Sequence, residues 1–293
     1  MASMQKIIVT GSNGQLGSEL RELASSFPEF EFVFLTRNDL ALDDMFALQG
    51  LVAQYQPAYL VNCAAYTAVD KAESEREAAF QVNAEAVGIL AEACAKQGAK
   101  FVHISTDYVF DGNRKAPLKE DDAVSPVNAY GESKLAGEEA ALGKNPDSLI
   151  IRTSWVYSYH GKNFVKTMMR LMAEKETISV VNDQWGSPTY AADLASTILQ
   201  IIRSGKWEGG IYHYSNEGVI TWFDFASEIG TLINTSCSIQ PTTTANFPTP
   251  AKRPHYSVMD KSKIQEVYGI KLRHWTESLR DCIQKLKENL TFH

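Results

Sequence analysis

A glycine-rich turn near the start of the chain limits its possible folds more than any other feature. Residues 10–17 read TGSNGQLG and stand between an apolar run at 6–10 and a helical pattern. In a strand-turn-helix unit, Gly11 permits a tight turn, Gly14 lets the backbone approach a pyrophosphate, and Gly17 allows the helix to pack closely on the strand. The helix N-terminus also offers unpaired N–H groups to phosphate. The turn therefore predicts a dinucleotide-binding loop, and a turn that only caps a helix is the less favoured interpretation.

Short apolar runs alternate with longer helical patterns through the first half of the chain. This alternation predicts parallel βαβ units with right-handed crossovers. Runs that are apolar throughout indicate a sheet covered on both faces. We therefore expect an α/β fold with a doubly wound Rossmann-type parallel sheet and a smaller C-terminal substrate-binding lobe. Strands are expected at 6–10, 32–35, 59–62, 100–105 and 149–153, and helices at 15–26, 45–55, 72–96 and 129–141.

The pattern loosens after Trp155, where helical segments are separated by loops that contain Gly and Pro. We expect residues 1–155 to form the NAD(P)-binding core and residues 156–293 to form mainly the substrate lobe, with some segments returning to the core. The stretch 241–254 holds four of the ten prolines and is predicted to be a surface loop without helix. Helices are expected at 163–173, 191–203, 222–233 and 276–288.

Composition excludes several classes of function. The net charge of −7 argues against a nucleic-acid binder, because that affinity rests on clustered Lys and Arg. No apolar run is long enough for a membrane span and no secretory signal is evident, so we expect a cytoplasmic protein. The cysteines show no metal-ligand or disulfide spacing, so reduced thiols and no metal site are expected; they are Cys63, Cys94, Cys237 and Cys282.

The residues after the second expected strand bear on the choice of cofactor. Many dinucleotide-binding folds carry an acid there that binds the ribose 2′-OH of NAD, whereas this chain has Thr36 and Arg37. An arginine accepts the 2′-phosphate of NADP instead. Arg37 therefore favours NADPH as the preferred cofactor, with NADH also possible. A solvated surface arginine is the alternative interpretation.

A tyrosine and a lysine stand four residues apart and are candidates for acid-base work. Tyr130 and Lys134 would share one face of a helix, one crossover after the strand that ends near Thr106. Hydride transfer to a carbonyl leaves an oxyanion that needs a proton, and a free tyrosine has a pKa of about 10. We expect the Lys134 ammonium to lower the pKa of Tyr130, and Thr106 to orient the reacting oxygen. An ordinary surface pair is the alternative.

Longer strings in both halves of the chain resemble the dTDP-4-dehydrorhamnose reductases, which are extended short-chain dehydrogenases. The likeness spans nearly the whole chain, and its middle strings are more specific than the glycine turn. The strings are NCAAYTAVDKAE at 62–73, STDYVF at 105–110, RTSWVY at 152–157, NDQWGSPT at 182–189 and PAKRP at 250–254.

The resemblance implies NAD(P)H-dependent reduction of the 4-keto group of dTDP-4-dehydrorhamnose to dTDP-L-rhamnose. It implies that Tyr130 donates the proton and that Lys134 holds the nicotinamide ribose. A common family acid after the second strand appears here as Ala41-Leu42. The resemblance places Gly14, Gln15, Leu16, Ala64, Ala65, Tyr66 and Thr67 along the cofactor, and Thr106, Asp107 and Trp155 against the sugar.

Three of the candidate substrate residues also have purely structural interpretations. Trp155 would serve as a core aromatic whose N–H bonds to backbone. Asp107 would cap a turn. Arg253 is a candidate partner of the substrate diphosphate, and equally a solvated charge or a structural ion pair.

Two rival functions and one assembly state remain open. Sugar 4,6-dehydratases carry a glutamate where this chain has Tyr108, which favours simple keto reduction; an epimerase is less cleanly excluded. A cofactor-binding regulatory subunit, similar to the beta subunit of methionine adenosyltransferase, is the rival of another class. A homodimer is possible. Some relatives are dimers bridged by Mg²⁺, but only Glu19 and Asp193 match the carboxylates concerned, so such a bridge is not expected.

Overall fold

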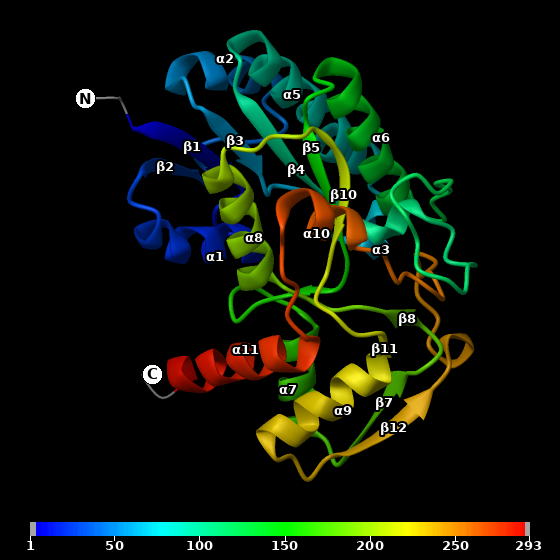
Figure 1. Cartoon of the computed structure of the whole chain (residues 1–293). Helices are drawn as coiled ribbons and strands as arrows, with labels where there is room; N and C mark the ends of the chain where they lie inside the picture. Colours follow the sequence, from blue (N-terminus) through cyan, green and yellow to red (C-terminus); the bar gives the residue numbers. More distant parts are fainter. Residues whose placement is uncertain (1–3, 291–293) are drawn as a thin grey trace.

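Six parallel strands form the central sheet of the computed structural model, which describes residues 4–290 (Figure 1). The strand order is β10-β5-β4-β3-β1-β2, so β2 lies on one side of β1 and the later strands lie on the other. This arrangement confirms the expected doubly wound Rossmann-type α/β fold. The strands are β1 (Gln5–Thr10), β2 (Phe30–Leu35), β3 (Tyr59–Asn62), β4 (Lys100–Thr106), β5 (Leu149–Thr153) and β10 (Gly210–Tyr214).

Helices cover both faces of the sheet, which explains why its strands are apolar on both sides. Ile7 and Val9 point toward α1 and α8, whereas Ile8 between them packs under α2 and α5. Each face is completely buried at these three positions. One layer comprises α2 (Met45–Tyr55), α5 (Ala86–Gln97) and α6 (Ala129–Lys144), and the other α1 (Gln15–Leu23), α8 (Ala191–Ser204) and α10 (Ser262–Tyr268).

A second apolar core lies in the lower lobe of Figure 1 and draws on the C-terminal half. Tyr157, Phe225 and Leu279 are buried at its centre. Residues of α8, β10 and α10 pack on the first core, so the C-terminal half contributes to both cores. No helix among residues 4–290 is long and apolar enough to cross a membrane. The lobe contains α7 (Phe164–Glu174), α9 (Trp222–Ile233), α11 (Trp275–Leu290) and the strand pairs β7 (Thr177–Val181) with β12 (Ser238–Thr242), β8 (Trp185–Gly186) with β11 (Ile220–Thr221), and β6 (Val156–Tyr157) with β9 (Thr189–Tyr190).

The prediction of a single helix at 72–96 is wrong. The chain instead forms α3, α4, one π-helical segment and α5. The π segment has a packing cause: a Cβ on Gly137 of α6 would lie 2.0 Å from the carbonyl oxygen of Asn83. Glycine at 137 thus lets α6 approach the wider π turn, and such turns are frequent at functional sites. The pieces are α3 (Val69–Ala72), α4 (Arg76–Phe80) and the π segment η2 (Gln81–Glu85).

The stretch 241–254 also differs from the prediction of a loop without helix. Its first two residues, Pro241 and Thr242, end strand β12, and a 3₁₀ turn follows at η4 (Thr244–Asn246). Proline is tolerated because β12 pairs only with β7 and is therefore an edge strand. Asp183 accepts hydrogen bonds from the backbone N–H of Thr244 at 2.9 and 3.0 Å, which fixes the turn. The other expected elements are present.

Candidate active site

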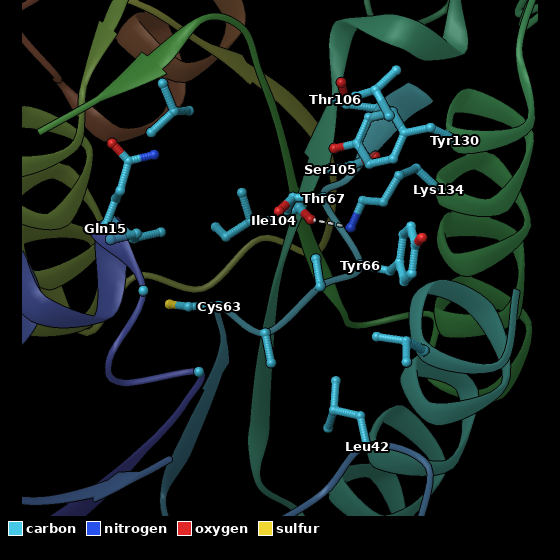
Figure 2. A pocket seen from close by; sticks show the side chains of 18 of the residues that line it. Gln15, Leu42, Cys63, Tyr66, Thr67, Ile104, Ser105, Thr106, Tyr130 and Lys134 are labelled. Atoms are coloured by element: carbon cyan, nitrogen blue, oxygen red, sulfur yellow. Dashed lines mark hydrogen bonds between the residues drawn. The ribbon is translucent and has the colours of Figure 1, made fainter. Parts of the chain in front are cut away.

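A cavity of about 1010 Å³ opens at the carboxyl ends of β1, β3 and β4. This edge is where the strand order reverses around β1, and open α/β sheets bind their ligands at such a point. Figure 2 shows Gln15 on one side of the cavity and Tyr130 and Lys134 on the other. The glycine turn and the candidate acid-base residues therefore face one space.

The glycine turn has the backbone shape that a pyrophosphate requires. Gly11 has φ +63°, and a Cβ there would lie 2.6 Å from the backbone nitrogen of Ala64. A Cβ on Gly17 would lie 2.5 Å from the carbonyl oxygen of Gly11, so Gly17 packs under the turn and does not line the cavity. Helix α1 begins after Gly14 without a side-chain cap. Its first N–H groups are thus available to an anion, and the turn fits a dinucleotide phosphate.

The adenosine end of the cavity holds charges of both signs. Arg37 lines it with 88% of its side chain exposed, and its guanidinium lies 4.0 Å from the Asp43 carboxylate. Leu42, of the Ala41-Leu42 pair where the resemblance implies a missing acid, also lines the cavity. Our sequence reasoning missed Asp43, the next acid along the same loop. The site thus offers a cation for a phosphate and an acid for a hydroxyl.

The loop after β3 is fixed to the neighbouring helix by one buried amide. Asn83 accepts a hydrogen bond from the backbone N–H of Tyr66 at 2.8 Å and donates to the Tyr66 carbonyl at 3.0 Å. Its amide nitrogen also donates to Ser133 Oγ at 2.9 Å. Asn83 was not predicted, although a buried amide in an apolar helical stretch is the signal that marks it. These hydrogen bonds fix the loop at Tyr66. The loop residues that line the cavity are Ala64, Ala65, Tyr66 and Thr67.

Tyr130 and Lys134 lie on successive turns of α6, close to the end of β4. Asn128 caps the helix by accepting a hydrogen bond from Gly131 N–H at 2.8 Å. Tyr130 lies within hydrogen-bond reach of Thr106, so the structure brings these two predicted residues together (Figure 2). Burial raises the pKa of Tyr130 to about 12, and the hydrogen bond with Thr106 offsets only part of this rise.

The expected lowering of the Tyr130 pKa by Lys134 does not occur. The Lys134 ammonium nitrogen donates to the Ile104 carbonyl at 2.7 Å and lies 3.2 Å from His103 Nε2. The ammonium is therefore held by strand β4, and burial, not Lys134, determines the direction of the Tyr130 pKa shift. Burial also lowers the pKa of Lys134 to about 8. The phenol thus stays protonated near neutral pH, which suits a proton donor.

Asp107 carries an unused acceptor in the cavity wall. The residue is 1% exposed; its Oδ1 accepts from Thr106 Oγ1 at 3.1 Å, and its Oδ2 has no partner among the described residues. Burial raises the pKa of Asp107 to about 6. The turn that follows is capped by Thr106, which accepts from Tyr108 N–H at 3.2 Å. Thr106 is thus the cap of this turn, and the Asp107 carboxyl, which also lies within hydrogen-bond reach of the Ser257 hydroxyl, keeps Oδ2 for a ligand hydroxyl.

Trp155 lines the cavity and packs tightly against its neighbours. Its ring stacks on Trp222 with centroids 3.6 Å apart and planes within 12°. A Cβ on Gly186 would lie 2.7 Å from the indole, so that residue must be glycine for the ring to fit. Trp155 also has φ +49°, a strained value for a side chain of its size. Backbone strain of this kind is often found at functional sites.

Arg253 lies outside the cavity-lining set. Its guanidinium pairs with the Asp70 carboxylate at 2.9 Å, and the same carboxylate accepts from Ala251 N–H at 3.1 Å. The structural ion pair is therefore the arrangement present, and it ties the proline-rich loop to α3. Residues that line the cavity but were not proposed for it include Leu40, Leu42, Asp43, Ile104, Ser105, Tyr108, Thr153, Val156 and Lys162.

One group of possible metal ligands lies where α1 meets the segment that follows β6. Glu19, Glu22 and His160 bring their ligand atoms within 4.8 Å of one another. The Lys285 ammonium lies 3.1 Å from Glu22 and already supplies a positive charge there. Asp193, the other candidate for a metal bridge, is bonded to Arg273 at 3.1 Å. Glu19 and Asp193 thus each have a cationic partner within the chain, Lys285 and Arg273.

Comparison with known proteins gives one consistent result. The family described as the RmlD substrate binding domain matches residues 4–288. The chain is 38% identical to a dTDP-4-dehydrorhamnose reductase of Aggregatibacter actinomycetemcomitans, over 95% of this chain and 98% of the relative. It is 41% identical to the spore coat polysaccharide biosynthesis protein SpsK of Bacillus subtilis, over 96% and 98%. A solved dTDP-4-dehydrorhamnose reductase of Bacillus anthracis in complex with NADP is similar to it with a TM-score of 0.92 and 39% identity, over 97% of this chain and all of the other.

Proposed function

The chain belongs to the RmlD substrate-binding-domain family, and we propose that it reduces the 4-keto group of dTDP-4-dehydrorhamnose to dTDP-L-rhamnose with NAD(P)H. One observation carries the proposal: Tyr130 and Thr106 meet in the same cavity as an uncapped helix N-terminus shaped for a dinucleotide. The test is oxidation of NADPH that depends on the keto sugar. A regulatory subunit would bind the cofactor without that turnover.

The residues of the cavity divide the work of a reduction. When bound, NAD(P)H would supply a hydride to the carbonyl carbon. The electron pair of the C=O π bond then moves to the oxygen, which becomes an alkoxide. Thr106 orients that oxygen by a hydrogen bond. Tyr130 then donates its hydroxyl proton, because an alkoxide is a stronger base than a phenolate even when the pKa of Tyr130 is about 12. Lys134 is the proposed holder of the nicotinamide ribose.

We propose NADPH as the preferred cofactor on the basis of Arg37. Arg37→Ala is expected to raise the KM for NADPH about tenfold and the KM for NADH less than twofold, because only NADPH carries the 2′-phosphate. Initial rates with each cofactor check this. Arg170→Ala is the matched control, since Arg170 is also exposed and paired with a carboxylate, but lies on α7 outside the cavity. Equal changes for both cofactors would show that Arg37 does not read the phosphate.

Trp155 and Asp107 are the proposed contacts to the sugar. Trp155→Ala is expected to raise the KM for the keto sugar about tenfold with little change in the Kd for NADPH, because an aromatic face on a hexose ring is lost. Trp155→Phe is the matched control: it has the same strained φ but keeps an apolar face. Steady-state kinetics and cofactor titration separate the two effects. Weakened NADPH binding in the alanine variant would contradict the assignment.

Two further statements about the protein in solution are proposals. We propose a homodimer whose mass is unchanged by EDTA, because Glu19 and Asp193 are bonded within the chain. Light scattering with and without EDTA tests this. The four cysteines are unpaired, which supports the expected residence in the reducing cytoplasm.

A further inference from the structure

A row of polar side chains crosses the sheet directly behind the cavity. Thr10, Asn62 and His103 are register partners on β1, β3 and β4, and each is at most 1% exposed. The residues that flank the row on β2 and β5 are Leu35 and Ile150, both apolar. Burying three polar groups in an otherwise apolar row costs free energy unless every group is bonded. The row therefore calls for an explanation beyond sheet stability.

The row leads to the Lys134 nitrogen. Thr10 Oγ1 lies 2.6 Å from the Asn62 amide oxygen, and the Asn62 amide nitrogen lies 3.1 Å from His103 Nδ1. His103 Nε2 lies 3.2 Å from Lys134 Nζ. Lys134 is itself 1% exposed and also donates to the Ile104 carbonyl. The four side chains thus form one buried chain of hydrogen bonds that ends on a proposed active-site residue.

The donors and acceptors in this row of four side chains permit two arrangements of protons. A neutral imidazole has one N–H donor and one acceptor nitrogen. If Nδ1 accepts from the Asn62 amide, Nε2 carries the proton and Lys134 must be a neutral amine. If Nε2 accepts from a Lys134 ammonium, Nδ1 carries the proton and the Asn62 oxygen must face it. A half-turn of the amide exchanges its oxygen and nitrogen without moving other atoms, so the same distances serve both.

We propose that His103 is a positioning residue that holds Lys134 as an ammonium ion, and that Asn62 and Thr10 set the His103 tautomer that makes this possible. The proposal rests on the role of Lys134 proposed above. In this arrangement His103 Nδ1–H donates to the Asn62 oxygen and the amide nitrogen donates to Thr10 Oγ1. Lys134 uses two of its N–H groups on the Ile104 carbonyl and His103, and the third is free for the cavity.

The surrounding charges favour the ammonium form. Burial holds the pKa of His103 well below its usual range, so the imidazole stays neutral and can accept. The pKa of Lys134, about 8, lies above neutral pH. Of the titratable groups that face Lys134, Tyr130 stays neutral, and Glu138 on the same helix raises the pKa of Lys134. Glu138 also forms an ion pair with Arg152 on β5.

The tautomer of His103 can be measured without any enzymatic assay. We expect ¹⁵N NMR of histidine-labelled protein to show a neutral ring at 103 protonated on Nδ1 between pH 6 and 7.5, with His103→Gln identifying the signal by its loss. A ring protonated on Nε2, or a charged ring, would overturn the proposal. Because this readout needs neither cofactor nor substrate, it is independent of the proposed reduction.

Kinetics test whether the contact acts through Lys134. His103→Gln keeps a strong acceptor for the ammonium, whereas His103→Met offers only a weak thioether acceptor. The methionine variant is expected to move the alkaline limb of the kcat profile down by about one pH unit, which lowers the rate about fivefold at pH 8 and closer to tenfold at higher pH. The glutamine variant is expected to keep the wild-type profile. An unshifted profile in the methionine variant, with only a lower plateau, would overturn the proposal.

Asn62→Leu provides a second route if His103→Met does not fold. It leaves His103 in place but removes the acceptor for Nδ1–H. The variant is expected to convert the ring to the Nε2–H tautomer and to shift the same alkaline limb downward. Retention of the Nδ1–H tautomer in Asn62→Leu would show that Asn62 does not set it.

Discussion

Tyr130→Phe is expected to lower kcat at least about a hundredfold while the Kd for NADPH stays within about twofold. The substitution removes the only proposed proton donor to the nascent alkoxide. It keeps the ring, which packs edge-on against Tyr108 with centroids 5.7 Å apart, so the cavity wall should survive. Because burial holds the pKa of Tyr130 near 12, the wild-type phenol remains protonated well above neutral pH. The alkaline loss of activity should therefore follow Lys134 and not Tyr130.

Tyr268→Phe controls for the loss of a tyrosine hydroxyl elsewhere. Its hydroxyl donates to the Glu208 carbonyl at 2.9 Å on the far side of the sheet from α6, outside the cavity. Steady-state kinetics and cofactor titration compare the two variants. Near wild-type turnover in Tyr130→Phe would remove Tyr130 from the mechanism.

Arg152→Met is expected to lower the free energy of unfolding by about 3–5 kcal/mol. Arg152 and Glu138 are each 2% exposed and form a two-pronged ion pair, with Nε 3.0 Å from Oε1 and a terminal nitrogen 2.7 Å from Oε2. Ser105 donates to the same carboxylate, so the pair ties β4 and β5 to α6 next to Thr106. Removal of the arginine alone leaves a buried carboxylate without its countercharge.

The double variant Arg152→Met with Glu138→Leu is the matched control for that loss. Replacing a buried ion pair by apolar groups of similar volume is often close to neutral, so we expect most of the stability to return. Urea unfolding followed by circular dichroism measures both variants. A double variant less stable than Arg152→Met would show that the packing of the two side chains, and not the unpaired charge, determines the effect.

The first half of the chain could be predicted because its signals are local. The run Ile7-Ile8-Val9 and the turn at Gly11 each follow from neighbouring residues, and β1 with its loop has the predicted form. Tyr130 and Lys134 also share a helix, so their spacing alone places them together. Long-range pairing was inferred from the βαβ alternation, which brought Thr106 to the same edge.

The features that sequence reasoning missed depend on contacts between distant segments. The π turn at Gln81–Glu85 exists because Gly137 packs against Asn83. Nothing in the sequence around either residue predicts this contact. Arg253 was a candidate for a diphosphate, but its partner Asp70 lies 183 positions away. The Lys134 environment differs for the same reason: His103 and the Ile104 carbonyl on β4 hold the ammonium, so it does not lower the pKa of Tyr130.

The most direct test of the account is the absorbance of NADPH in the presence of enzymatically generated dTDP-4-dehydrorhamnose, followed by chromatographic identification of the product. We predict loss of one NADPH for each dTDP-L-rhamnose formed, and no loss when the keto sugar is omitted. If NADPH binds tightly yet is not consumed when the keto sugar is present, the chain is not this reductase, and the regulatory-subunit interpretation takes its place.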